Sequence, residues 1–155
     1  MRAFSATEIL ALSIAPRAGD GPYLSQTTTQ CGSLALRSSG GAPALGNVVY
    51  ALDLTLGTPG PYALFLGFDR CSFGGFLPLP AAGGTLAPAL NGCTVLADAA
   101  FSASGIATGL SASVGVPILP SVNLLGVTVF GQAVAIDVAT GAASASNGFG
   151  ISIGN

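Results

Sequence analysis

Residues 47–68 read NVVYALDLTLGTPGPYALFLGF, and this stretch decides the fold class. In its first half apolar side chains recur at every second position, as in a strand with one buried face: Val48, Tyr50, Leu52, Leu54 and Leu56. The turn-forming residues 57–61 (GTPGP) then turn the chain back. Residues 62–68 are a nearly continuous apolar run, which is typical of a central strand. The stretch therefore predicts two successive strands.

The rest of the chain has the same organisation, with short apolar runs separated by Gly, Pro and Ser. Residues 126–138 form a long run that is apolar on both faces, and residues 106–114 alternate as one strand would. In residues 69–90 prolines fall where they would interrupt a ladder, which predicts edge segments or loops. The pattern predicts an all-β fold, an antiparallel β-sandwich (Ig-like or jelly-roll-like) of about 8–10 short strands with little or no helix.

The composition is apolar and almost uncharged. Of the 155 residues, 50% are hydrophobic and 6% are charged, with four Lys plus Arg, six Asp plus Glu, no His and a net charge of −2. Four scattered Arg cannot form a nucleic-acid-binding surface. Without His there is no His-based triad and no His-ligated zinc. We expect no enzyme activity, no catalytic residue, and no cofactor or metal site.

The mean hydropathy of +0.72 raises the question of a membrane span. The longest stretch without a charge, residues 99–136, is broken by Gly, Ser, Asn and two Pro. A spanning helix needs about 20 predominantly apolar residues in succession. We therefore expect no membrane insertion.

Residues 1–28 differ from the rest of the chain. Arg2 and the apolar run 9–15 could form a short signal peptide, but Glu8 directly before the run argues against this reading. The alternative is a strand with one apolar face, made of Leu10, Leu12 and Ile14. Residues 19–30 (GDGPYLSQTTTQ) are polar and predict a linker, in which three threonines are candidates for O-linked sugar: Thr27, Thr28 and Thr29. We expect an N-terminal strand with its linker over residues 1–28 and the sandwich domain over residues 29–155.

Six segments follow one another in the rest of the chain: QCGSLALRSSGGAPALGNVVYALDL, YALFLGF, GGFLPLP, LNGCTVLAD, VPILPSVNLLGVTVFGQAVAIDV and SNGFGISIG. In order and spacing, from about Thr29 onward, the chain resembles the C-terminal β-domain found on many secreted proteins of planctomycete-type bacteria. The resemblance implies an extracellular β-sandwich used as an accessory or surface module. No activity is known to us for this family.

Three cysteines in an extracellular chain imply one disulfide and one remaining thiol. The resemblance implies that Cys31 and Cys93 are the pair. The alternative pair, Cys71 and Cys93, would close a shorter loop around the Pro-rich segment. Without His or Lys nearby to form a thiolate, no cysteine is expected to be a nucleophile.

Four aspartates each stand alone in the sequence: Asp53, Asp69, Asp98 and Asp137. A glycosidase needs two carboxylates brought together in a cleft, and a calcium site is typically marked by an Asp-x-Asp run. Since neither signal is present, we expect these groups to be solvated loop or strand-end charges. A hydrolase with an Asp pair is therefore the weakest functional hypothesis.

The missing charge is the main indication of function. A free monomer stays soluble through surface charges of both signs, whereas a neutral surface suits a protein covered by identical neighbours or by glycan. We expect a non-enzymatic structural protein, extracellular or at the cell surface. Copies of it would assemble head-to-tail into a filament or surface layer.

The N-terminal strand supplies a candidate mechanism for this assembly, because it can add to an exposed sheet edge of the next subunit. Pairing of the same strand within its own sandwich is the open alternative. The alternative function is an accessory carbohydrate- or surface-binding module of a secreted protein. Its contact would be residues 74–88 and the neighbouring turns.

Overall fold

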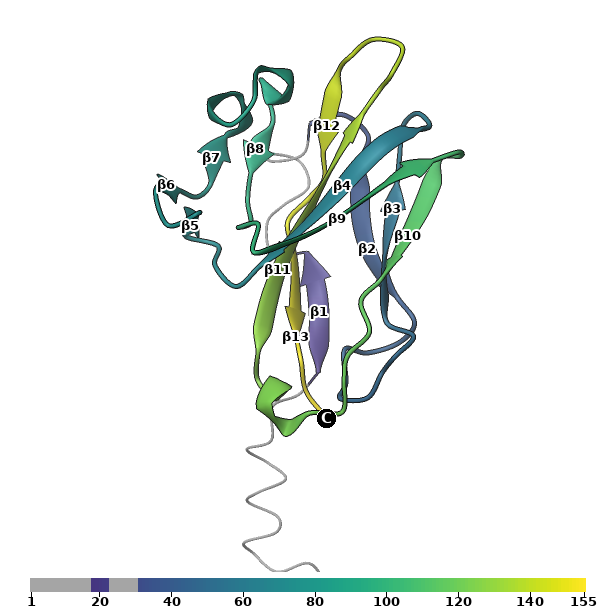
Figure 1. Cartoon of the computed structure of the whole chain (residues 1–155), viewed down its shortest axis with the longest axis vertical. Helices are drawn as coiled ribbons and strands as arrows, with labels where there is room; N and C mark the ends of the chain where they lie inside the picture. Colours follow the sequence, from purple (N-terminus) through teal and green to yellow (C-terminus); the bar gives the residue numbers. More distant parts are fainter. Residues whose placement is uncertain (1–17, 23–30) are drawn as a thin grey trace, which may run out of the picture.

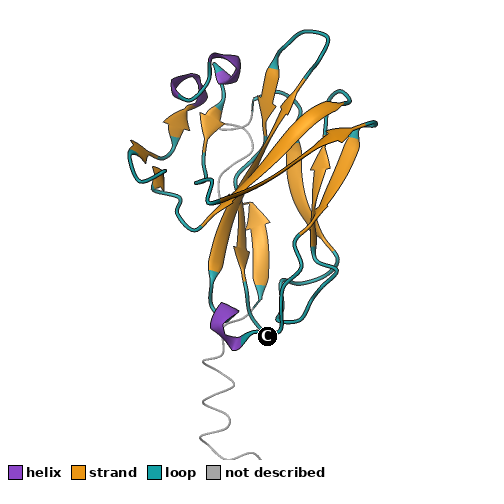
Figure 2. Ribbon diagram, in the orientation of Figure 1, coloured by secondary structure: helices purple, strands orange, loops and turns teal. Residues whose placement is uncertain are grey.

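The computed structural model describes residues 18–22 and 31–155, and these form two packed antiparallel sheets (Figures 1 and 2). The larger sheet has the order β1-β13-β11-β4-β9, with β12 paired to β11, and the smaller sheet has the order β10-β3-β2. The strands of the larger sheet are β1 (Gly19–Pro22), β4 (Gly60–Gly67), β9 (Phe101–Ala107), β11 (Thr128–Ile136), β12 (Ala143–Ala145) and β13 (Phe149–Ser152). Those of the smaller sheet are β2 (Ala35–Ser39), β3 (Ala51–Thr55) and β10 (Ser111–Gly115). The predicted all-β sandwich is confirmed.

The strand count is higher than the 8–10 expected from the pattern. Thirteen strand segments lie in the described ranges, because residues 69–97 contain four strands of two residues each: β5 (Ser72–Phe73), β6 (Leu77–Pro78), β7 (Ala81–Ala82) and β8 (Thr94–Val95). The helical content of these ranges is three single turns of 3-10 helix: η1 (Gly83–Thr85), η2 (Pro88–Leu90) and η3 (Val122–Leu124). The expectation of little or no helix is confirmed.

The core lies between the two sheets and is built by the alternation that the sequence displays. On the side of the smaller sheet, Leu52 and Leu54 of β3 and Tyr50, directly before β3, are fully buried. They pack against one face of the larger sheet, which contributes Leu64, Ala133, Ala135, Phe149 and Ile151. Val48 was predicted on the same face but is 64% exposed, because it lies in the turn that precedes β3.

Two connections cross between the sheets where the sequence suggested local pairing. The turn at residues 57–59 does not return β4 onto β3, since β3 pairs with β2 and β10 while β4 pairs with β9 and β11. Residues 106–114 are likewise not one strand. A bend at residues 108–110 divides them between β9 in the larger sheet and β10 in the smaller one.

The linker expected over residues 19–30 is wrong for its first four residues. Gly19–Pro22 form β1, which pairs with β13 from Gly19 opposite Ser152 to Pro22 opposite Phe149. The hydroxyl of Tyr50 donates a hydrogen bond of 2.8 Å to Oδ2 of Asp20, which ties this edge strand to the smaller sheet. Residues 23–30 lie outside the described ranges.

Residues 69–97 form a side lobe that lies against the outer face of the larger sheet (β5 to β8 in Figure 1). Gln132, on the outer face of β11, attaches the lobe. Its Oε1 accepts a hydrogen bond of 2.9 Å from the Leu96 N–H, and its Nε2 donates to the carbonyl of Thr94 at 2.8 Å. The lobe is therefore fixed by backbone contacts to one side chain of the central strand.

Candidate functional site

Three of the four predicted aspartates hold turns in place, and the fourth, Asp53, lies within β3. Asp69 accepts hydrogen bonds from the Ser72 hydroxyl and the Cys71 N–H, and these lower the pKa of its carboxyl. Asp98 accepts from two backbone N–H groups, and Asp137 caps the turn that follows β11. Within the described ranges, no group of three or more His, Cys, Asp or Glu could hold a metal ion. These carboxylates therefore organise loops, and this arrangement does not support the hydrolase hypothesis.

The disulfide joins Cys31 to Cys93, the pair that the resemblance implied, with 4.9 Å between the Cα atoms. It ties the side lobe to the larger sheet, because the backbone of Cys31 exchanges two hydrogen bonds with Ala145, at the end of β12. The alternative pair, Cys71 with Cys93, is wrong. Cys71 is an exposed free thiol on the lobe.

Three buried polar side chains were missed by the sequence reasoning. Besides Gln132, Ser146 accepts from the Ala133 N–H at 2.9 Å. Asn147 bonds both backbone groups of Leu36, accepting at 3.0 Å and donating at 3.2 Å. Among the described side chains, every buried nitrogen and oxygen has a hydrogen-bond partner. These residues therefore connect sheets and lobe, since their polar groups are engaged in holding backbone.

An apolar groove lies between the lobe and the outer face of the larger sheet. Two adjoining hollows of about 290 and 300 Å³ share Phe65, Leu90 and Val134 as walls. No charged side chain is among the described residues that line them, and the amide of Gln132 is already bonded to backbone. The groove therefore offers apolar contact and few groups that could orient a polar ligand.

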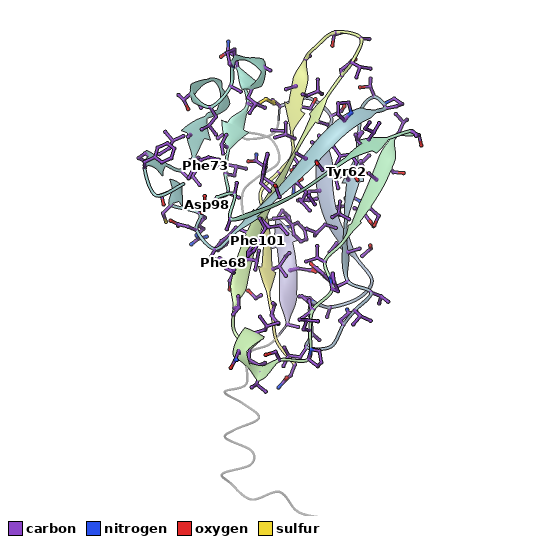
Figure 3. All side chains as sticks on the ribbon, in the orientation of Figure 1. Tyr62, Phe68, Phe73, Asp98 and Phe101 are labelled. Carbon is purple, nitrogen blue, oxygen red and sulfur yellow. A yellow bond between two sulfur atoms is a disulfide. The ribbon has the colours of Figure 1, made fainter. Side chains whose placement is uncertain are left out.

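A pair of exposed aromatic rings lies where β4 ends and β9 begins (Figure 3). Phe68 and Phe101 meet edge-to-face with 5.7 Å between ring centroids, and each is more than half exposed. The Arg70 guanidinium lies 5.6 Å from the centroid of the Phe130 ring. The sequence placed Phe68 in an apolar run but carried no signal that the ring would reach the surface.

Strand β9 forms one edge of the larger sheet and, within the described ranges, pairs only with β4. Its sequence, FSASGIA, contains no charge and no proline. Phe101 is 58% exposed and Ile106 is 78% exposed. Natural edge strands are usually blunted by Lys, Pro, bulges or a covering segment. β9 has neither Lys nor Pro and is the strongest candidate for a contact with another chain.

The remaining predicted site residues cannot be placed. The apolar face of Leu10, Leu12 and Ile14 and the threonines Thr27, Thr28 and Thr29 lie outside the described residues.

In the part of the chain that the structure covers, no helix is long and apolar enough to cross a bilayer. Comparison with protein-family models, with curated proteins and with solved structures finds no match for this chain.

Proposed function

We propose that this protein is a non-enzymatic structural subunit that works outside the cell and self-assembles through the free edge of β9. The observation that carries the proposal is the chemistry of this edge. Along the seven residues of β9, the backbone N–H and C=O groups of every second residue point away from β4, and the strand contains no charged residue and no proline. Such an edge is a template for pairing with a strand of another chain.

Surface composition supports this proposal. Ten charged residues in 155 leave most of the surface neutral, so an interface on it would not have to desolvate many ions. A head-to-tail contact that does not close into a ring generates a filament. The disulfide supports an extracellular location, because such bonds persist in oxidising compartments.

The test compares the wild type with a charged edge variant by light scattering after size exclusion and by negative-stain electron microscopy, without reductant. Ala103 of β9 is half-buried on the core-facing side of the edge. A lysine there can reach water in the monomer but would be covered by an added strand. We expect wild-type filaments or multimers and a monomeric Ala103→Lys variant.

Thr55→Lys is the matched control, because Thr55 is exposed on β3, the central strand of the smaller sheet. It adds the same charge away from any sheet edge and should assemble like the wild type. A wild-type protein that stays monomeric at high concentration would overturn the proposal, and so would an Ala103→Lys variant that is folded and assembles normally.

The second candidate is an accessory carbohydrate- or surface-binding module, and the exposed Phe68–Phe101 pair favours it, since aromatic faces can stack on sugar rings. Its signature would be a monomer retained on polysaccharide columns. Phe68→Ala should abolish that retention while leaving the fold intact. No retention of the wild-type protein on any polysaccharide tested would remove this candidate.

A further inference from the structure

We infer that the strand added to β9 comes from the N-terminal segment of a neighbouring copy, with Leu10, Leu12 and Ile14 facing the core. The inference rests on the proposed function, because it identifies the segment that pairs with β9 in the proposed assembly. Four observations carry it: the free edge, an incomplete core beside it, a matching side-chain pattern and the length of the chain.

The core is open on the side of β9 and β10 and closed on the opposite side. On the closed side Leu34 and Leu36, before and within β2, are each 1% exposed. On the open side Val114 of β10 packs against the core yet remains half-buried. Ala103 and Gly105 of β9 also remain half-buried, although they face inward opposite Leu64 and Tyr62. An apolar strand face placed here would remove this surface from water.

The middle of β9 presents small residues on its inward side. Its inward positions in mid-strand carry a methyl group at Ala103 and no side chain at Gly105. The Tyr62 ring already covers Gly105, with its hydroxyl oxygen 2.7 Å from the place that a Cβ would occupy, so a large side chain beside Gly105 would pack against this ring. Figure 3 labels Tyr62 on β4. Leu10, Leu12 and Ile14 repeat at every second residue, as the inward positions of β9 do. Large residues on the added strand would therefore face small ones.

The length of the chain decides which copy supplies the strand. Three strands separate β1 from β9, so a strand added beyond β9 lies about 24 Å across the sheet from β1. Through the register of the sheet, Gly19 is level with Thr128 of β11, whereas Phe101, the end of β9 nearer to that level, is level with Gly131. This offset of three residues adds about 10 Å along the strand direction. Ile14 precedes Gly19 by five residues, which span at most about 18 Å. Ile14 therefore cannot lie beside β9 of its own subunit.

The first experiment is disulfide trapping in the full chain. Ser13 and Ser104 both alternate with the inward-facing positions, so cysteines at these sites would face each other on the outer side of the added strand. We would combine Ser13→Cys with Ser104→Cys, and in a second variant with Ser102→Cys, both in a Cys71→Ser background. Thr55→Cys with Ser13→Cys is the control. We expect a ladder of cross-linked chains on non-reducing gels from at least one edge variant and none from the control.

The second experiment changes the strand itself. Replacing Leu10, Leu12 and Ile14 together by Ser should abolish assembly, whereas Ala11→Ser with Ala15→Ser on the opposite face should not. A synthetic peptide of residues 4–15 (FSATEILALSIA) should cap β9 and shorten the polymers, and the same peptide with the three Ser replacements should not.

The outcomes separate the inference from the proposed function. Polymers that form without a cross-link, together with normal assembly of the triple Ser variant, would overturn the inference and leave self-assembly through β9 standing. A cross-link confined to single chains would refute the argument from chain length. Monomers under all conditions would overturn both.

Discussion

Replacement of Gln132 gives the sharpest test of how the side lobe is attached. The side chain is 3% exposed and makes three hydrogen bonds to backbone: from the Leu96 N–H at 2.9 Å, to the Thr94 carbonyl at 2.8 Å and to the Ser146 carbonyl at 3.0 Å. Gln132→Met keeps the length of the side chain and removes all three bonds. Three backbone groups then lose their partners.

The magnitude follows from these three groups. A buried donor or acceptor left without a partner costs about 1–3 kcal/mol. Leu96 and Ser146 are 1% and 0% exposed, so water does not replace the lost partners readily. Even the low end of this range for each of the three groups gives a sum of about 3 kcal/mol. The disulfide still holds the lobe at Cys93, so we expect local loosening as well as lower global stability.

Urea unfolding followed by far-UV circular dichroism measures the global cost, and amide hydrogen exchange at Leu96 measures the local opening. The control is Thr128→Val on the same strand. It removes one hydrogen bond, 3.2 Å long, between the hydroxyl groups of Thr128 and Ser152, and neither residue belongs to the lobe. It should cost under about 1 kcal/mol and leave the exchange of Leu96 unchanged. A Gln132→Met variant that loses less than about 1 kcal/mol, or keeps full protection of Leu96, would refute the reasoning.

Three further predictions concern other parts of the fold. Replacing Cys31 and Cys93 by Ala should lower the free energy of unfolding by about 4 kcal/mol, because the bond closes a 62-residue separation; an unchanged urea midpoint would contradict this. Burial raises the pKa of Tyr50 from its ordinary value of 10.0, so the folded chain keeps this proton longer than the unfolded one. The free energy of unfolding should therefore not depend on this group below pH 10 and should fall above pH 10 by at most about 1.4 kcal/mol per pH unit. Tyr50→Phe should remove this fall in thermal unfolding measured at alkaline pH. Gly67→Ala should cost about 1–3 kcal/mol in thermal unfolding, because its Cβ would stand 2.6 Å from the Asp98 carbonyl oxygen, and a stable variant would mean that this backbone shifts freely.

Local patterns predicted the strands well where one face is buried. Leu52 and Leu54 alternate with Ala51 and Asp53, and the structure buries the two leucines completely. The run at residues 62–68 was predicted to be central, and β4 does lie between β9 and β11. Alternation is a local property, because successive side chains of a strand point to opposite faces whatever the strand pairs with.

The same reasoning failed where the outcome depends on distant residues. Gly19–Pro22 looked like a linker because the segment is polar and rich in glycine, yet β13 and the Tyr50 hydroxyl fix it as a strand. Gln132 stood in an apolar run, with nothing in its neighbours to indicate that its amide would bond the backbone of the lobe. The connections from β3 to β4 and from β9 to β10, which cross between the two sheets, were not predicted either, because they depend on which distant strands pair.

The sequence by itself determined the class of fold, the faces of its longest strands and the scarcity of charge, since all three depend on composition and short-range periodicity. The tertiary structure alone decided that β9 lies at an edge, that the core stays open beside it and that the aromatic pair reaches the surface. An edge is defined by the absence of a neighbour. Which strands become neighbours depends on pairing between residues far apart in the chain. The alternation of side chains within one strand does not indicate which other strand it pairs with.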